Sequence, residues 1–329
     1  MNQQSKKPFS RDIIKINNVE EVCNNIISKL KNDVYNKLGR HGAIVGISGG
    51  IDSSVSLALA AKALGPENVT GIIMPEQDSS PDSKLLADKL ARKFNVTTIL
   101  ENITGALSGF NCYERRDEAA KRVFPDFDPK MHKMKIGVKD TGLYTNLPPV
   151  FYITIVEPSG EEKSKRLPAK EFRQIMAASN FKQRSRMSML YYHAESLHYA
   201  VIGTPNKHEM DQGFFVKYGD GGADVMPIGH LYKAQVYQIA EYLDVPQEII
   251  DRTPTTDTYT AEQTQEEFFY QLPFEMLDLL WYAFENNYSP QEVGPVVNKS
   301  PDDIGKIYMN FERKIKTTEY LRMSPIKDY

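Results

Sequence analysis

The sequence has few cysteines and lacks any long apolar run. Only Cys23 and Cys112 are present, without a Cys-x-x-Cys pair, so neither a disulfide framework nor thiol-relay chemistry is indicated. The first residues, Met-Asn-Gln-Gln-Ser-Lys-Lys-Pro, lack the apolar core of a signal peptide, and no apolar stretch has the length of a membrane span. We therefore expect a cytoplasmic protein that does not associate with membranes.

The chain also lacks a large excess of positive or negative charge. The chain of 329 residues carries 40 Lys and Arg against 43 Asp and Glu, a net charge of −3. Without a basic excess there is no general electrostatic reason to bind nucleic acid, so small molecules are the expected partners. Apolar residues make up 41% of the chain, which is enough for a full hydrophobic core.

The first third of the chain alternates helices with strands. An amphipathic helix over 18–38 begins at Asn18, which has the capping partner Glu21 in its first turn. The patterns that follow predict a strand at Gly42–Ile47, a helix to Leu64, a strand at Val69–Met74, a helix at Pro81–Phe94 and a strand at Val96–Leu100. This alternation predicts an α/β fold with a doubly wound, Rossmann-like parallel sheet that binds ligands at the carboxyl ends of its strands.

The alternation breaks in the proline-rich stretch 125–170. Two runs there, Val150–Val156 and Lys163–Leu167, flank a Glu-Pro-Ser-Gly turn and predict a β-hairpin insertion with irregular flanks. A helix over Lys170–Leu197, a strand at Tyr199–Gly203, a helix at Tyr232–Leu243 and a helical tail over 262–329 are expected next. We expect one domain over 1–329, with the insertion inside it.

A glycine-rich loop lies between the first predicted strand and the next helix. It reads Gly46-Ile47-Ser48-Gly49-Gly50-Ile51-Asp52-Ser53-Ser54. Glycines let the backbone N–H groups converge on one anion, and the helix that begins near Asp52 adds its positive dipole end. No lysine follows the glycines, which speaks against a nucleotide hydrolase that grips β- and γ-phosphates with such a lysine. The loop predicts a phosphate-binding site.

The second half supplies further polar groups at the same edge of the predicted sheet. Gly203-Thr204-Pro205-Asn206-Lys207-His208-Glu209 follows a strand, so Glu209 is a candidate second magnesium ligand opposite Asp52. The loop from Phe214 to Asp224 holds three glycines and is typical of a ligand-contacting loop. Within it Lys217 is a candidate for phosphate contact and Asp224 for contact with a ribose hydroxyl or an amine.

The Ser-Gly-Gly-x-Asp-Ser run resembles the pyrophosphate loop of the ATP pyrophosphatase superfamily, the adenine nucleotide alpha hydrolase type. Further stretches narrow the resemblance to ammonia-dependent NAD synthetase: Asn180–Met187, Gly203-Thr204 with Glu209, Gly213–Asp224, Pro227-Ile228, Lys233 and Pro254-Thr255-Thr256-Asp257. The match covers about residues 18–110 and 175–325. It implies a homodimeric ligase that forms a carbon–nitrogen bond and uses ATP and Mg²⁺.

The resemblance also implies residue roles. ATP would be bound by Gly46, Ile47, Ser48, Gly49, Gly50, Ile51, Asp52, Ser53, Thr204, Lys233 and Thr255. Magnesium would be held by Asp52 and Glu209. The substrate deamido-NAD would be bound by Arg184, Lys217 and Asp224, and the residues acting in catalysis would be Asp52, Lys217 and Lys233.

Two features depart from the family pattern. Where the family carries a His-Lys pair that contacts substrate, this sequence has Tyr320-Leu321, and compact family members lack the insertion at 125–170. Both departures concern the acid substrate rather than ATP. About 40 residues precede the phosphate loop, whereas glutamine-using relatives carry a nitrilase-like domain there, so the implied nitrogen source is free ammonia or a separate glutaminase.

The implied reaction needs no protein nucleophile. A substrate carboxylate attacks the α-phosphorus of ATP, pyrophosphate leaves into the loop, and ammonia displaces AMP from the acyl-adenylate. The main hypothesis is amidation of deamido-NAD to NAD. The alternative is a related amidoligase that adenylates a different carboxylate. A non-catalytic nucleotide-binding module and a tRNA-thiolating relative are disfavoured, the first by the joint presence of Asp52, Glu209 and Lys217, the second by the missing cysteine pair.

Overall fold

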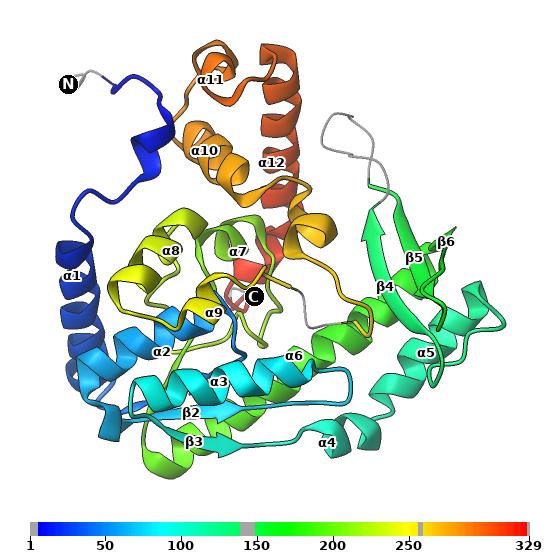
Figure 1. Ribbon diagram of the computed structural model, residues 1–329, viewed down its shortest axis with the longest axis horizontal. Coiled ribbons are helices and arrows are strands. Elements are labelled where there is room, and N and C mark those ends of the chain that lie inside the picture. Colours follow the sequence, from blue (N-terminus) through cyan, green and yellow to red (C-terminus); the bar gives the residue numbers. More distant parts are fainter. Residues whose placement is uncertain (1–5, 139–148, 256–258, 328–329) are drawn as a thin grey trace.

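A four-stranded parallel sheet forms the centre of the protein. A computed structural model describes residues 6–138, 149–255 and 259–327. The strand order is β3 (Thr97–Leu100), β2 (Val69–Ile73), β1 (Ala43–Gly46) and β7 (Ala200–Ile202). Ala43 is in register with Val69 on one side and with Ala200 on the other, both in parallel pairs. The predicted parallel α/β fold is confirmed (Figure 1).

Helices cover both faces of this sheet, as the apolar, buried strands β1 and β7 require. Ala43 and Val45 point into a core shared with α1 (Val19–Asn32), α2 (Ile51–Leu64), α3 (Pro81–Lys93) and α8 (Lys233–Tyr242). Ile44 points to the opposite face, where α6 (Ala169–Leu197) supplies Met187 and Leu190. The alternation along β1 therefore divides one strand between two cores.

A second, antiparallel sheet lies beyond the amino-terminal half of α6. Its strands are β4 (Lys133–Val138), β5 (Phe151–Val156) and β6 (Glu162–Arg166), in that order. The predicted hairpin is β5–β6, whereas sequence analysis missed β4, α4 (Thr104–Gly109) and α5 (Cys112–Val123). Met134 and Ile136 of β4 are fully buried, whereas Lys133 is exposed and Lys135 and Gly137 are half-buried, so the strand alternates. Residues 139–148 of the predicted insertion lie outside the described part of the chain.

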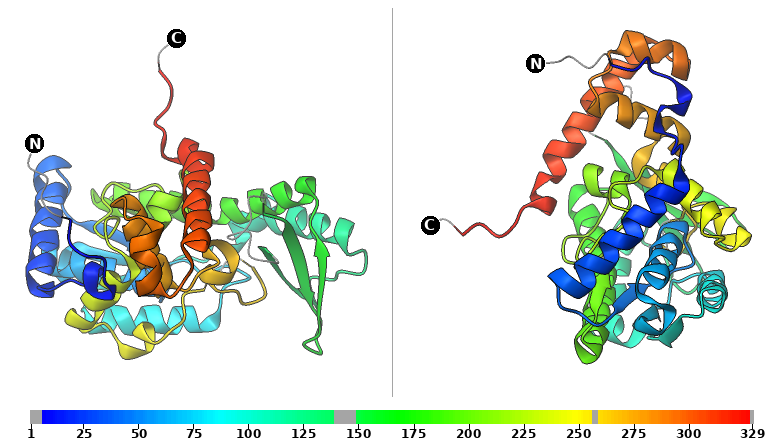
Figure 2. Two further views of the ribbon diagram at one scale, coloured as in Figure 1. Left: turned by 90° about the horizontal axis from the view of Figure 1, so that it is seen from above. Right: turned by 90° about the vertical axis from the view of Figure 1, so that its left-hand side faces the viewer.

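The carboxyl-terminal helices pack together on one side of the parallel sheet (Figure 2). They are α10 (Phe274–Glu285), α11 (Pro290–Val297) and α12 (Pro301–Arg322). Trp281 is buried among them with its ring 4.9 Å from that of Phe311, and Phe9 and Ile14 from the amino terminus join the same core. The tail is helical, as predicted, and its tryptophan serves packing.

The remaining short elements connect these parts. They are η1 (Arg11–Ile14), η2 (Asp33–Lys37), η3 (Pro66–Asn68), α7 (Lys207–Gln212), α9 (Gln247–Ile250) and η5 (Glu266–Tyr270). In the part of the chain that the structure describes, no helix combines the length and apolar character needed to cross a bilayer.

Candidate active site

The glycine-rich loop joins β1 to α2, as its sequence predicts. Gly49 has a φ of +74°, and a Cβ atom there would lie 2.7 Å from the backbone oxygen of Ser83, so only glycine fits. The Gly50 N–H donates to Ser48 Oγ at 3.3 Å, and Ser53 Oγ donates to the Gly50 carbonyl at 3.0 Å. These bonds fix the first turn of α2, where free N–H groups and the helix dipole favour an anion.

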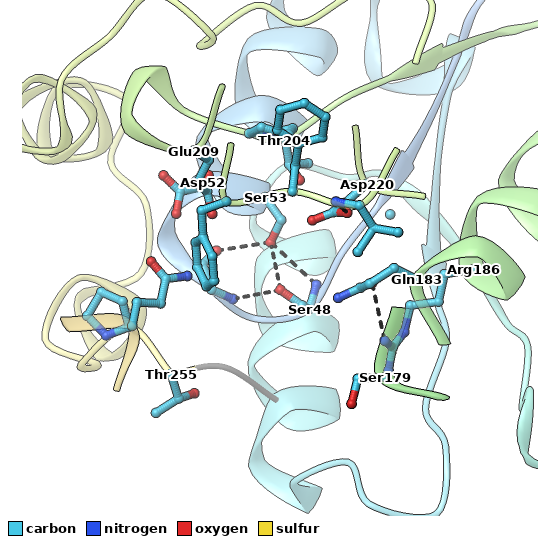
Figure 3. Close-up of a pocket in the computed structure, with 18 of the residues that line it drawn as sticks. Ser48, Asp52, Ser53, Ser179, Gln183, Arg186, Thr204, Glu209, Asp220 and Thr255 are labelled. Carbon is cyan, nitrogen blue, oxygen red and sulfur yellow. Dashed lines mark hydrogen bonds between the residues drawn. The ribbon is translucent and has the colours of Figure 1, made fainter. Parts of the chain in front are cut away.

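Asp52 and Glu209 lie next to each other beside this loop, although they come from distant parts of the sequence (Figure 3). Asn206 links them: its Nδ2 donates to Asp52 Oδ1 at 3.1 Å, and its backbone N–H donates to Glu209 Oε2 at 2.8 Å. Asn206 also caps α7 through its side-chain oxygen. Sequence analysis missed this role, although an Asn three residues before a Glu is a capping-box pattern.

The two carboxylates are electrostatically coupled to one lysine. Burial, reinforced by the charge of Asp52, raises the pKa of Glu209 to about 8. Burial alone lowers the pKa of Lys233, but the charges of Asp52 and Glu209 outweigh it and the net shift is upward. Lys233 is fully buried and its Nζ donates to Asp52 Oδ2. One ammonium therefore faces two acidic side chains, and Glu209 holds its proton more tightly than an exposed glutamate does.

The Asp52–Glu209 pair fits a magnesium ion that also binds substrate phosphate. Within the described residues, no group of three or more acidic, histidine or cysteine side chains converges on a metal site. Mg²⁺ is commonly held by one or two carboxylates, with phosphate oxygens and water completing its octahedron. Burial and the charge of Asp52 raise the pKa of Glu209, and a cation beside it would stabilise its charged form.

A cavity of about 550 Å³ opens in front of the loop, at the carboxyl ends of β1, β2 and β7. Most of the residues predicted to bind ATP or metal line it: Gly46, Ile47, Ser48, Gly50, Ile51, Asp52, Ser53, Thr204, Glu209 and Thr255. Two predicted residues do not line the cavity: Gly49 packs against α3, and Lys233 is buried with its ammonium bonded to Asp52. This is the position that the topology of a doubly wound sheet dictates for a ligand.

The residues predicted to bind the acid substrate lie elsewhere. Arg184 Nε donates to the Lys217 carbonyl at 3.1 Å. Lys217 Nζ points to the end of α12, where it donates to the carbonyls of Tyr320 at 2.9 Å and Met323 at 2.7 Å. Asp224 is exposed and accepts a hydrogen bond from the Val201 N–H at 2.8 Å. Arg184, Lys217 and Asp224 are absent from the lining of the 550 Å³ cavity.

Helix α6 presents a polar face to the cavity that sequence analysis did not single out. Ser179, Gln183 and Arg186 lie on this face, and Arg186 Nη1 donates to Gln183 Oε1 at 3.3 Å (Figure 3). Their spacing along the helix was a usable signal, since residues three and four apart share one face. Arg184 lies off this face, in the same stretch Asn180–Met187.

Two further groups at the cavity are notable. Burial raises the pKa of Asp220 to about 6, and this carboxylate accepts a hydrogen bond from the Val216 N–H at 2.7 Å. Tyr320 and Leu321, which stand where the family pattern has His-Lys, also line the cavity. The departure from the pattern therefore lies at the site itself.

Comparison with known proteins decides the family. The family model described as NAD synthase matches residues 22–128 and 153–325. The chain belongs to the NAD synthase family. It is 43% identical over 319 residues to the NH(3)-dependent NAD(+) synthetase of Rhizobium rhizogenes, covering 97% of this chain and 95% of that protein. The corresponding protein of Rhizobium meliloti is 42% identical, covering 98% of this chain and 95% of that one.

Solved structures agree on the fold of the NAD synthase family. The NH3-dependent NAD synthetase of Campylobacter jejuni has a TM-score of 0.57 at 23% identity, covering 94% of this chain and 97% of that one. The NMN synthetase of Francisella tularensis has a TM-score of 0.64 at 22% identity, covering 94% and 98%. The family match leaves out residues 129–152, which include β4 and the first residues of β5.

Proposed function

We propose that this protein is an ammonia-dependent NAD synthetase, a ligase that amidates deamido-NAD to NAD while ATP is split into AMP and pyrophosphate. The observation that carries the proposal is the glycine-rich loop facing the Asp52–Glu209 pair in one cavity. It is supported by relatives of that name at 43% and 42% identity over nearly the whole chain.

In the first step the nicotinate carboxylate oxygen attacks the α-phosphorus, and the bond from that phosphorus to the bridging oxygen breaks. The loop over residues 46–53 receives the leaving pyrophosphate, with Thr204 and Thr255 as further ATP contacts. Asp52 and Glu209 would hold Mg²⁺, which supplies positive charge against the phosphates when bound. Lys233 keeps Asp52 oriented and offsets its charge.

In the second step ammonia attacks the carbonyl carbon of the acyl-adenylate, AMP leaves with the electron pair, and the new amide loses a proton. Only uncharged ammonia has the required lone pair. Water would hydrolyse the acyl-adenylate, so the intermediate must be kept from water until ammonia arrives. We assign the acid substrate to Arg184, Lys217 and Asp224. Because these lie outside the cavity of one chain, we further propose a homodimer in which the partner completes the acid site.

The proposal extends to the domain organisation, the location and the nitrogen source of the protein. The chain forms one domain over 1–329, with an insertion at 125–170 and a helical tail at 262–329. The protein is cytoplasmic, uses small-molecule substrates and neither nucleic acid nor membrane, and takes ammonia either free or from a separate glutaminase. A pull-down that recovers a glutaminase favours the second nitrogen source.

A second candidate is amidation of a different nucleotide carboxylate. It is favoured by Tyr320 and Leu321, which line the cavity where the family pattern has a His-Lys pair. A panel of acids, scored by AMP release with ammonium and ATP present, separates the two. AMP formation with deamido-NAD supports the main proposal. Turnover of another acid together with none of deamido-NAD refutes it, and release of ADP and phosphate refutes both.

A further inference from the structure

One wall of the cavity rests on the sheet β4–β5–β6. The chain from 252 to 269 contributes Thr255, Tyr259 and Gln265, among others, to the cavity lining. Residues 259–263 run along β4 (Figure 1). The Ala261 N–H donates to the Met134 carbonyl at 3.1 Å, and the Met134 N–H donates to Thr260 Oγ1 at 2.7 Å.

These bonds cover the open edge of β4. Strand β4 pairs with β5 on its other side, so its outer N–H and C=O groups need partners. Further along, a Cβ on Gly137 would lie 3.1 Å from Gln263 Nε2, so the glycine lets this side chain lie close to the strand. Tyr259 is buried in the same apolar core as Met134 and Ile153. The stretch 259–263 is thus attached to the sheet by both backbone and side chains.

Backbone pairing connects the stretch attached to β4 with residues 254–255 of the cavity wall. Thr264 forms an antiparallel bridge with Thr255, and the Gln265 N–H donates to the Pro254 carbonyl at 3.2 Å. The sheet also adds a wall of its own, because Phe151 at the start of β5 stacks on Phe172 with ring centroids 4.1 Å apart, and both rings line the cavity. Strand β4 and Phe151 lie in the stretch that the family model leaves out.

We propose that strand β4 is a positioning element for ATP: it anchors 259–261 and, through the pairing of 264–265 with 254–255, holds Thr255 in place in the wall of the cavity that the glycine-rich loop also lines. The proposal rests on the proposed function only in taking ATP as the occupant. Thr260 acts here as a positioning residue, because its hydroxyl contacts β4 rather than the substrate.

The test measures binding of α,β-methylene ATP with Mg²⁺ by calorimetry, with no acid present. Thr260→Val removes the acceptor for the Met134 N–H and should weaken Kd about fivefold, the equivalent of one net hydrogen bond. Thr260→Ser keeps the acceptor and should restore binding to within about twofold of the wild type. Thr260→Ala replaces the valine variant if that variant does not fold.

Ser164→Ala is the matched control. It removes the 2.7 Å contact between Ser164 Oγ and Thr154 Oγ1, which joins β5 to β6 in the same sheet away from Thr260. Binding should be unchanged in this variant, and amide exchange at Ala261 should rise only in Thr260→Val. Unchanged binding in Thr260→Val, or equal weakening in Ser164→Ala, overturns the proposal. Failure of the acid panel leaves this readout intact, because no acid takes part.

Discussion

The phosphate side of the cavity is assembled from adjacent strand ends of one chain, whereas the side chains predicted to hold the acid are tied to the outer surface and to helix α12. Asp52, Glu209 and Asn206 share hydrogen bonds beside the loop. Lys217 instead donates both of its described hydrogen bonds to carbonyls at the end of α12. The first arrangement is complete within one chain. The position of Lys217 is explained if the acid site forms between two chains or only when substrate binds.

The largest expected effect is on the phosphate side. Asp52→Asn removes one metal-binding charge and the partner of Lys233 while changing little volume. We expect turnover to fall by about a thousandfold or more, because metal charge stabilises the phosphates in the transition state. Initial rates of AMP release measure this, with thermal unfolding to check the fold. Asp88→Asn on the surface of α3 is the control, and turnover within a few-fold of wild type would contradict the metal role.

Asn206→Ala should come next in size. It removes the contact to Asp52 at 3.1 Å and the side-chain cap of α7, which carries Glu209. Loss of a cap costs about 1 kcal/mol of stability. Displacement of two charged groups should lower kcat/KM for ATP by about ten- to a hundredfold. Ser300→Ala, which removes a comparable cap from α12, should lose similar stability and keep its activity. Equal kinetic loss in both variants would make Asn206 merely structural.

Local sequence predicted the loop between β1 and α2 well because its geometry is local. A strand, two glycines and a helix start specify the loop within nine residues, and parallel topology brings Glu209 to the same edge. The contacts that depend on distant segments were not predictable in this way. The direction of Lys217 is decided by α12, about a hundred residues later. Strand β4 has an alternating local pattern, but the segment that completes its edge, 259–263, lies more than a hundred residues later in the sequence.

Lys217→Met tests the other side of the comparison. If Lys217 contacts the acid, the KM of this variant for deamido-NAD should be about tenfold higher than that of the wild type. The KM for ATP should stay the same, since the lost interaction concerns one substrate only. Lys163→Met removes a surface ion pair with Glu157 and controls for general charge loss. An equal rise in both KM values would show that Lys217 acts by holding α12 rather than by contacting the acid.

The last test concerns stability rather than activity and joins the two sides through α12. Lys314 on this helix donates to the Phe269 carbonyl at 3.0 Å, and Phe269 lines the cavity. Burial lowers the pKa of Lys314 from 10.5 to about 7. Between these values the unfolded chain holds a proton that the folded chain has released, so wild-type stability should rise as the pH increases from 7 toward 10.

Lys314→Met removes this ionisation and keeps an apolar stem in the same place. Its free energy of unfolding should exceed that of the wild type at pH 6, where the folded protein must bury the charge, and the difference should shrink as the pH rises through 7 to 10. Urea unfolding at several pH values measures it, with Lys306→Met, which removes a lysine paired with Asp302 on the same helix, as the control. A pH-independent difference between Lys314→Met and wild type would show that the amine stays charged. In that case α12 holds the cavity wall through a contact between the Lys314 ammonium and the Phe269 carbonyl. A charged lysine would then stabilise each side of the cavity, Lys233 on one and Lys314 on the other.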